Sequence, residues 1–329
     1  MNVRHILYKG MEKKKLKIVF FGTPEFAVAS LDRLVKEGYD IAAVVTMPDK
    51  IAGRGHKLIQ SDVKQYAEAH GLRVLQPEKL KSPEFISQLQ EIGADLFIVI
   101  AFRMLPEIVW SMPPSGTFNL HGSLLPKYRG AAPINRAVMN GETETGITTF
   151  FLKHEIDTGD IIEQRKTPIT DEDNAGTVHD RLMAMGAEMV ASTVKKIEEG
   201  SLQTIPQPEG EFIGAPKIFK EDCEIDWTNL SKKIHDQIRG LSPYPAAFTT
   251  IVDASGKEMP VKIFDTKISQ KACGETQPGD IVTDERSMWV RTYDGMLEII
   301  SLQPAGKKRM EVSSYLRGYH PVRTKKISD

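Results

Sequence analysis

Apolar runs and amphipathic segments alternate along roughly the first 200 residues of the chain. Runs at 16–21, 41–46 and 95–101 are mostly apolar, as is typical of strands buried on both faces of a sheet. The segment between the first two runs carries Leu31 and Leu34 at helical spacing and stops at Gly38. This repeated order of strand, helix and strand predicts an α/β fold with a doubly wound, mostly parallel, Rossmann-like sheet.

Polar residues and prolines mark where the helices of this region should begin. Thr23 is predicted to be the N-cap of the first helix, with Pro24 at its first position and Glu25 in its first turn. Further helices are predicted at 61–69, 83–92, 132–139 and 174–199, and further strands at 73–76, 117–121, 147–152 and 160–164.

The chain changes character after residue 202. Residues 203–220 begin with a segment rich in proline and polar residues and are predicted to be a linker. A helix is predicted at 229–239, and short alternating segments follow at 249–252, 260–268, 279–283, 288–292 and 296–302, which is the spacing of a small β-barrel. The predicted order is therefore a flexible extension (1–15), a first domain (16–202), the linker (203–220) and a barrel domain (221–329).

Composition and cysteine usage narrow the class of protein. Of the 329 residues, 40% are apolar and 26% are charged, which fits a globular protein with a full hydrophobic core. No apolar run approaches the roughly 20 residues that span a bilayer, and residues 1–15 lack the apolar stretch of a signal peptide. Cys223 and Cys273 lie in no metal-binding or redox spacing. We therefore expect a cytoplasmic monomer with inert thiols, no metal and no membrane association.

Charge is distributed unevenly along the chain although the formal net charge is only −1. Residues 1–20 carry six basic side chains and one acidic one, and residues 301–329 carry seven basic and two acidic ones. Such basic ends are compatible with two interpretations, solubilising tails or segments that contact phosphates.

The first candidate for chemistry is the stretch 116–130. Its opening residues indicate a strand in which Asn119 and His121 point to one face, because side chains two apart in a strand share a face. Gly122 then ends the strand, and the carboxyl ends of strands in α/β sheets are where ligands bind. An amide can stabilise an oxyanion and an imidazole can accept a proton near neutral pH, so the pair suits acyl transfer. Asp157, in an Ile-Asp-Thr-Gly turn after a strand, is the candidate to orient His121.

Each of these residues also has a plain structural interpretation. Asn119 can end a strand, His121 can be a half-buried and satisfied side chain, and Asp157 can be a turn residue. Nucleotide binding at the first strand–helix turn is excluded, because Gly22 is followed by Thr-Pro-Glu instead of a glycine-rich fingerprint. The Glu25 carboxylate would also compete with a pyrophosphate for the helix N-terminus. No nucleotide cofactor is therefore expected.

Two motifs taken together are far more specific than their parts. Asn-Leu-His-Gly-Ser-Leu-Leu-Pro-Lys-Tyr-Arg-Gly-Ala-Ala-Pro-Ile at 119–134 and His-Glu-Ile-Asp-Thr-Gly at 154–159 closely resemble the 10-formyltetrahydrofolate-dependent formyltransferase family. The resemblance extends from about Leu16 to the C-terminus and is greatest for members that act on methionyl-tRNA. Gly122 stands where relatives often carry alanine. The resemblance implies transfer of a formyl group from 10-formyltetrahydrofolate to methionyl initiator tRNA, and an OB-like second domain that holds the tRNA.

The resemblance also implies roles for particular residues. Asn119, His121 and Asp157 would be catalytic. Folate contacts are expected from Ser123, Leu124, Leu125, Pro126, Met104 and Leu105. Contacts to tRNA are expected from Arg54 and Lys57, in a polar loop at 47–58, and from Lys307, Lys308 and Arg309.

Two alternative functions remain at this point. One is a formyltransferase for a small amine such as glycinamide ribonucleotide, a family that shares the Asn/His/Asp set but usually lacks a barrel domain. The other is a non-catalytic folate- or RNA-binding protein on the same scaffold, against which the complete triad argues.

Overall fold

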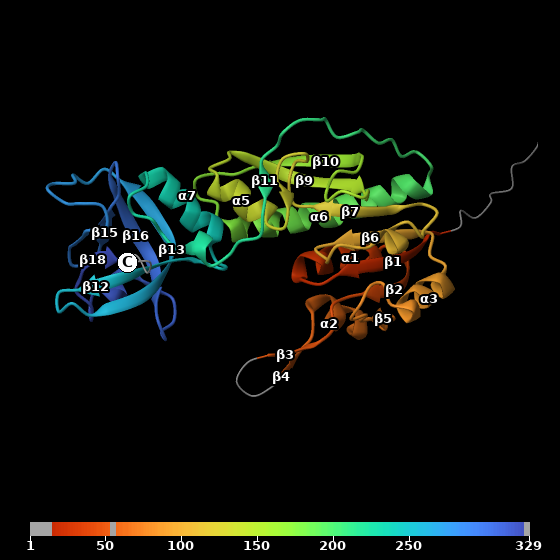
Figure 1. The fold of residues 1–329 in the computed structure, drawn as a ribbon, viewed down its shortest axis with the longest axis horizontal. Helices are drawn as coiled ribbons and strands as arrows, with labels where there is room; N and C mark the ends of the chain where they lie inside the picture. The colour runs from red at the N-terminus through yellow and green to blue at the C-terminus, as the bar shows by residue number, and fades with distance from the viewer. Residues whose placement is uncertain (1–14, 53–56, 326–329) are drawn as a thin grey trace, which may run out of the picture.

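A seven-stranded sheet forms the centre of the first domain (Figure 1). The computed structural model describes residues 15–325 except 53–56, and leaves out the side chains of residues 51, 52 and 57. The strand order is β10-β9-β7-β6-β1-β2-β5, with all neighbours parallel up to β7 and with β9 and β10 antiparallel. The strands are β1 (Lys17–Gly22), β2 (Asp40–Val45), β5 (Val74–Leu75), β6 (Leu96–Ile100), β7 (Thr117–His121), β9 (Glu144–Phe151) and β10 (Ile161–Pro168). The predicted doubly wound, mostly parallel sheet is confirmed.

Helices cover both faces of this sheet because successive strand residues point to opposite sides. Phe20 packs in a core with α1, α2, α5 and α6, whereas its neighbour Phe21 packs in a second core with α3 and α4. The helices are α1 (Glu25–Lys36), α2 (Asp62–Ala69), α3 (Pro83–Ile92), α4 (Glu107–Trp110), α5 (Pro133–Met139) and α6 (Ala175–Glu198). None of the helices in the described residues is long and apolar enough to cross a membrane.

The start of α1 differs from the prediction. Pro24, not Thr23, is the N-cap residue, and no side chain caps this helix. The Thr23 carbonyl accepts a hydrogen bond from the Val63 amide at 3.3 Å, and the buried Thr23 hydroxyl has no partner among the described residues. Pro24 is extended at φ −83° and ψ 173°, so the helix begins only at Glu25.

The second domain is a barrel-like antiparallel sheet of seven strands, as predicted. The order is β14-β15-β16-β13-β12-β18, with β17 paired to β16, and the backbone bridge between Asp280 and Arg323 brings the two ends together. Its elements are η1 (Glu221–Cys223), α7 (Ser231–Leu241), β12 (Ala247–Asp253), β13 (Glu258–Ser269), β14 (Ile281–Thr283), β15 (Met288–Arg291), β16 (Met296–Pro304), β17 (Met310–Glu311), α8 (Val312–Tyr315) and β18 (Pro321–Lys325). β17 and β18 were not predicted from the sequence.

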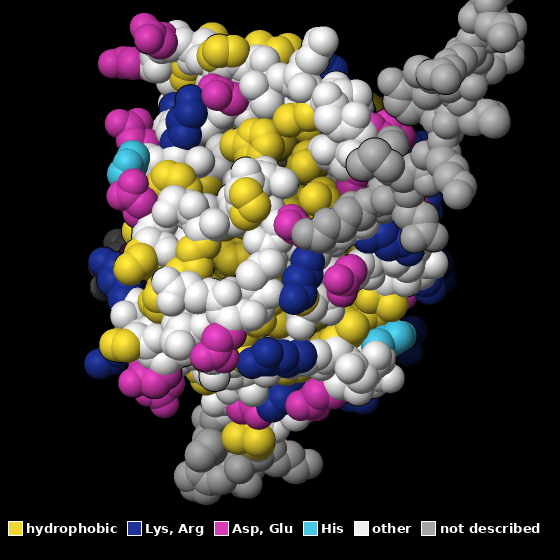
Figure 2. Space-filling model, turned by 90° about the vertical axis from the view of Figure 1, so that its right-hand side faces the viewer, with side chains coloured by type: hydrophobic (Ala, Val, Ile, Leu, Met, Phe, Trp, Pro, Cys, Tyr) yellow, Lys and Arg dark blue, Asp and Glu magenta, His cyan; other side chains and the backbone are white. Residues whose placement is uncertain are grey.

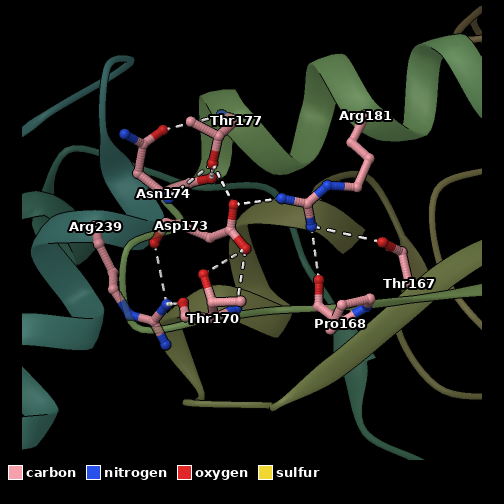
Figure 3. Close-up of polar contacts among 8 residues, drawn as sticks. All are labelled: Thr167, Pro168, Thr170, Asp173, Asn174, Thr177, Arg181 and Arg239. Carbon is pink, nitrogen blue, oxygen red and sulfur yellow. Dashed lines mark hydrogen bonds and ion pairs between the residues drawn. The ribbon is translucent and has the colours of Figure 1, made fainter.

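The two domains are joined by polar contacts centred on the buried side chains of Asp173 and Arg239 (Figure 3). Arg239 of α7 donates from Nη1 to the carbonyls of Thr170 and Asp173, both at 3.0 Å. The Asp173 carboxylate accepts from the Thr170 amide at 2.9 Å, from the Thr177 hydroxyl at 2.9 Å and from Arg181 at 2.6 Å. These bonds outweigh burial, which by itself raises the pKa of Asp173, and they lower that pKa to about 2.

Two segments predicted as irregular turn out to be structured. In the predicted loop at 47–58, β3 (Lys50–Ala52) pairs with β4 (Lys57–Ile59), so the prediction of a loop without regular structure was wrong at these positions. Strand pairing satisfies backbone groups that a loop would leave to water. The segment after α6 runs along the outer edge of β10 (Figure 1) and ends in β11 (Gly214–Ala215), which pairs with β8 (Arg129–Gly130). The extension 1–14 lies outside the described residues.

Candidate active site

The three predicted catalytic residues line one cavity of about 660 Å³ at the carboxyl end of the sheet. Asn119 and His121 alternate along β7 with Phe118 and Leu120, which are buried in the core on the α1 and α6 side. Asp157 reaches the same cavity from the turn after β9, the antiparallel neighbour of β7. Strand pairing thus brings together residues that are 36 or more positions apart in the sequence.

Both ring nitrogens of His121 face oxygen atoms. Nε2 lies 2.8 Å from the Tyr128 carbonyl oxygen, and Nδ1 lies 3.8 Å from Oδ2 of Asp157. Because a carbonyl only accepts, Nε2 must be the donor, and a second proton taken up by the ring would point toward Asp157. The same Oδ2 accepts the Gly130 amide at 2.9 Å. The carboxylate is therefore held by the backbone and remains available to the imidazole.

Asn119 is half-buried, and its side-chain amide is free to bind a ligand. Among the described residues, none donates to or accepts from this amide. An amide that can donate to an oxyanion, next to an imidazole and a carboxylate that can handle protons, suits acyl transfer.

The cavity has two sides, one on each face of the sheet edge. On the first side the walls are the loop 101–107, Trp110 and residues 152–156. On the second side they are Pro24, Phe26 of α1, His179 of α6 and residues 131–135 at the start of α5. Asn119 and His121 line the same cavity as both groups of residues, so it offers walls for a donor and for an acceptor molecule next to them.

Met104 and Leu105, which were predicted to contact folate, both line the first side. Met104 is 73% exposed whereas Leu105 is buried, so Met104 is the residue that a ligand would cover. The mouth of this side is bridged by His154 and Glu107, whose Nε2 and Oε1 atoms are 3.1 Å apart. Trp110 also lines this side but was not predicted, because the sequence around it does not distinguish it from an ordinary core residue.

Ser123, Leu124, Leu125 and Pro126 are not among the residues that line the cavity, and their contact with folate stays a prediction. This turn folds back onto β9 and β10, away from the cavity. The Thr148 hydroxyl donates to the Ser123 carbonyl at 2.7 Å, and Gln164 donates to the Leu125 carbonyl at 2.8 Å. Ser123 and Leu125 are buried, whereas Leu124 and Pro126 are partly exposed.

Three of the predicted tRNA contacts, Lys307, Lys308 and Arg309, are not among the residues that line the cavity. Lys307, Lys308 and Arg309 are exposed on the turn between β16 and β17. Arg309 stacks over the Phe264 ring at 4.7 Å and also donates to the Ser301 hydroxyl, so its side chain is already oriented. Arg54 lies outside the described residues, and Lys57 is placed in β4 by its backbone alone.

On the end of the first domain shown in Figure 2, basic and acidic side chains are interspersed, so this face presents no continuous basic patch. Metal binding also receives no support within residues 15–325 as described, where no three His, Cys, Asp or Glu side chains converge as ligands.

The chain matches two family models over most of its length. A formyl transferase model covers residues 16–194, and the model of the formyl transferase C-terminal domain covers residues 217–320. The methionyl-tRNA formyltransferase of Bacteroides fragilis is 56% identical over 315 residues, 94% of this chain and 97% of the relative. That of Flavobacterium johnsoniae is 47% identical over 93% of this chain and 96% of its own.

Solved structures share the fold at low sequence identity. A sugar 3N-formyl transferase, WlaRD, solved with dTDP and 5-N-formyl-THF, matches with a TM-score of 0.63 at 21% identity, over 89% of this chain and 99% of that one. The glycinamide ribonucleotide transformylase 1 of Symbiobacterium toebii matches with a TM-score of 0.51 at 20% identity, over 59% of this chain and 96% of that one. On its domain content and its identity to full-length relatives, the chain belongs to the formyl transferase family.

Proposed function

We propose that this protein transfers the formyl group of 10-formyltetrahydrofolate to the α-amino group of methionyl initiator tRNA. The observation that carries the proposal is the convergence of Asn119, His121 and Asp157 on one cavity. Support for the acceptor comes from relatives named methionyl-tRNA formyltransferase, which align with 93–96% of this chain at 46–56% identity.

The reaction forms one carbon–nitrogen bond and breaks another. The methionyl amine attacks the formyl carbon, and the carbonyl oxygen gains negative charge in a tetrahedral intermediate. Asn119 donates a hydrogen bond to that oxygen, and protonated His121 adds charge stabilisation. His121 or a bound water passes the amine proton to the folate nitrogen as the bond from that nitrogen to the formyl carbon breaks. Asp157 orients the imidazole and attracts its second proton.

The two sides of the cavity suit the two substrates. We assign the folate to the first side, where Met104 and Leu105 offer the apolar slot that the family resemblance implies for the pterin. The methionyl end of the tRNA then enters from the second side, between Phe26 and Ile134. Their apolar side chains match the methionine side chain, and the amine would meet the formyl group at Asn119 and His121.

The length of the chain favours a tRNA acceptor over glycinamide ribonucleotide. The solved glycinamide ribonucleotide transformylase aligns with only 59% of this chain, whereas the curated relatives align with the barrel as well. We assign tRNA backbone contacts to the exposed turn with Lys307 and Lys308, and to the β3–β4 hairpin that carries Lys57. A monomer and a cytoplasmic location remain predictions from the sequence.

One assay tests the proposal. The enzyme is supplied with 10-formyltetrahydrofolate labelled at the formyl carbon, and with methionyl initiator tRNA, glycinamide ribonucleotide or a nucleotide-linked amino sugar in separate reactions. We expect label to transfer to methionyl-tRNA and to remain on folate with the small amines. Transfer to a small amine with none to methionyl-tRNA would replace the proposed function with the alternative.

A further inference from the structure

The segment 205–215, which we call the strap, crosses the two loops that support the catalytic residues. At its start, Ile205 exchanges two backbone hydrogen bonds with Ile161 of β10, at 2.8 and 2.9 Å. At its end, Gly214 and Ala215 pair in parallel with Arg129 and Gly130. This part of the predicted linker is therefore paired with β10 at its start and with β8 at its end.

Gln207 is the strap residue that contacts the Asp157 turn. Its amide nitrogen donates to the carbonyls of Asp157 and Gly159, both at 2.8 Å, and its amide oxygen accepts from Arg129 at 2.6 and 3.2 Å. The orientation of the amide is unambiguous, because carbonyls only accept and a guanidinium only donates. Gln207 thus ties the turn carrying the carboxylate to the loop that follows His121.

The backbone that Gln207 holds is in an uncommon conformation. Asp157 has φ +56°, in the left-handed region that non-glycine residues rarely adopt. Tyr128, whose carbonyl faces His121, has φ +61°, and its amide donates to the Ile213 carbonyl of the strap at 2.6 Å. Such conformations persist only where surrounding contacts hold them, and the strap supplies a contact at both positions.

The strap also lies closely against the Gly130 backbone. The Gly130 amide donates to Oδ2 of Asp157, and a Cβ atom added there would lie 2.5 Å from the Ala215 carbonyl oxygen. Gly130 has φ +126°, which also favours glycine. The strap, the Gly130 amide and the Asp157 carboxylate therefore form one continuous set of contacts.

We propose that Gln207 is a positioning residue for formyl transfer, acting through Asp157. Its two donated hydrogen bonds keep the Asp157 peptide in the left-handed conformation that directs Oδ2 toward His121 and Gly130. Loss of these donors would let the turn relax and move the carboxylate away from the imidazole. The inference rests on the proposed function, because it concerns the efficiency of that reaction.

The first test compares variants of Gln207 in the full-length protein, with methionyl-tRNA as acceptor. Gln207→Ala removes the donors, and Gln207→Glu removes them while keeping an acceptor for Arg129. We expect both variants to lower kcat about 10- to 100-fold and to change KM for 10-formyltetrahydrofolate less than about threefold. A misplaced catalytic group slows the chemical step more than it weakens substrate binding. The control Gln203→Ala, at an exposed strap-flanking glutamine, should match the wild type.

The second test asks whether Gln207 acts through Asp157. In an Asp157→Ala background, measured in single turnovers at excess enzyme, Gln207→Ala should lower the rate by less than about threefold. An equal fall in both backgrounds, or a Gln207→Glu variant as active as the wild type, would overturn the inference. A wild-type enzyme inactive on methionyl-tRNA would instead overturn the proposed function, so the two failures are distinguishable.

Discussion

Replacing Asp173 with asparagine should weaken the junction between the domains in a pH-dependent way. The carboxylate is buried and receives hydrogen bonds from Thr170, Thr177 and Arg181 (Figure 3). Its pKa falls from 3.8 to about 2, and each pKa unit corresponds to about 1.4 kcal/mol. The charged form therefore contributes about 2 kcal/mol to the free energy of unfolding at neutral pH.

The sign of the pH dependence follows from the depressed pKa. The contribution is complete above the unfolded-state value near 4 and is lost as the pH falls toward about 2, where the folded carboxylate takes up its proton. Asp173→Asn should therefore be about 2 kcal/mol less stable than the wild type at pH 7. Between pH 4 and pH 2 the difference should shrink toward zero, because the wild-type side chain becomes neutral as well.

Urea denaturation followed by tryptophan fluorescence at several pH values measures this difference. Asp171→Asn is the matched control, because it removes the same charge from an exposed neighbour two residues away. We expect the control to unfold at nearly the wild-type urea concentration throughout. A wild-type minus Asp173→Asn difference that stays constant from pH 7 to pH 3, or that grows as the pH falls, would refute the reasoning.

Three further predictions concern the site and its supports. Asn119→Ala and Asp157→Ala should each lower the formylation rate about 10²–10³-fold in single-turnover kinetics. Calorimetry should give melting temperatures close to that of the wild type. A rate near that of the wild type would remove the substituted residue from the mechanism. Met104→Ala should raise KM for 10-formyltetrahydrofolate about fivefold and leave KM for methionyl-tRNA unchanged. Ile134→Ala should raise KM for methionyl-tRNA about fivefold and leave KM for 10-formyltetrahydrofolate unchanged. The opposite pair of results would assign the folate to the second side of the cavity and the methionyl end to the first. Gly130→Ala should lower the free energy of unfolding by about 2–3 kcal/mol, because its Cβ would collide with the Ala215 carbonyl, and an unchanged denaturation midpoint would contradict that geometry.

The hydrophobic pattern of the sequence predicted several buried elements of the first domain correctly. The apolar runs at β1, β2 and β6 and the spacing of Leu31 and Leu34 report burial directly, because the pattern repeats within a few residues. Asn119 and His121 were placed on one face for the same reason, since both lie in one strand. The prediction that Thr23 is the N-cap of α1 was wrong. The Thr23 carbonyl accepts a hydrogen bond from the Val63 amide of α2, and the sequence around Thr23 gives no indication of this contact.

The convergence of the three predicted catalytic residues on one cavity is a tertiary result. The sequence by itself determined most strands and helices of the first domain and the presence of the barrel, since these follow from local propensity and hydrophobic period, and the resemblance to a known family indicated most of the candidate residues. Only the packed chain decided that Asp157 reaches His121, that the Ser123 carbonyl accepts a hydrogen bond from Thr148, and that Gln207 ties Asp157 to Arg129. The physical reason is that hydrogen bonds between distant segments depend on register and packing, which short-range sequence patterns do not encode.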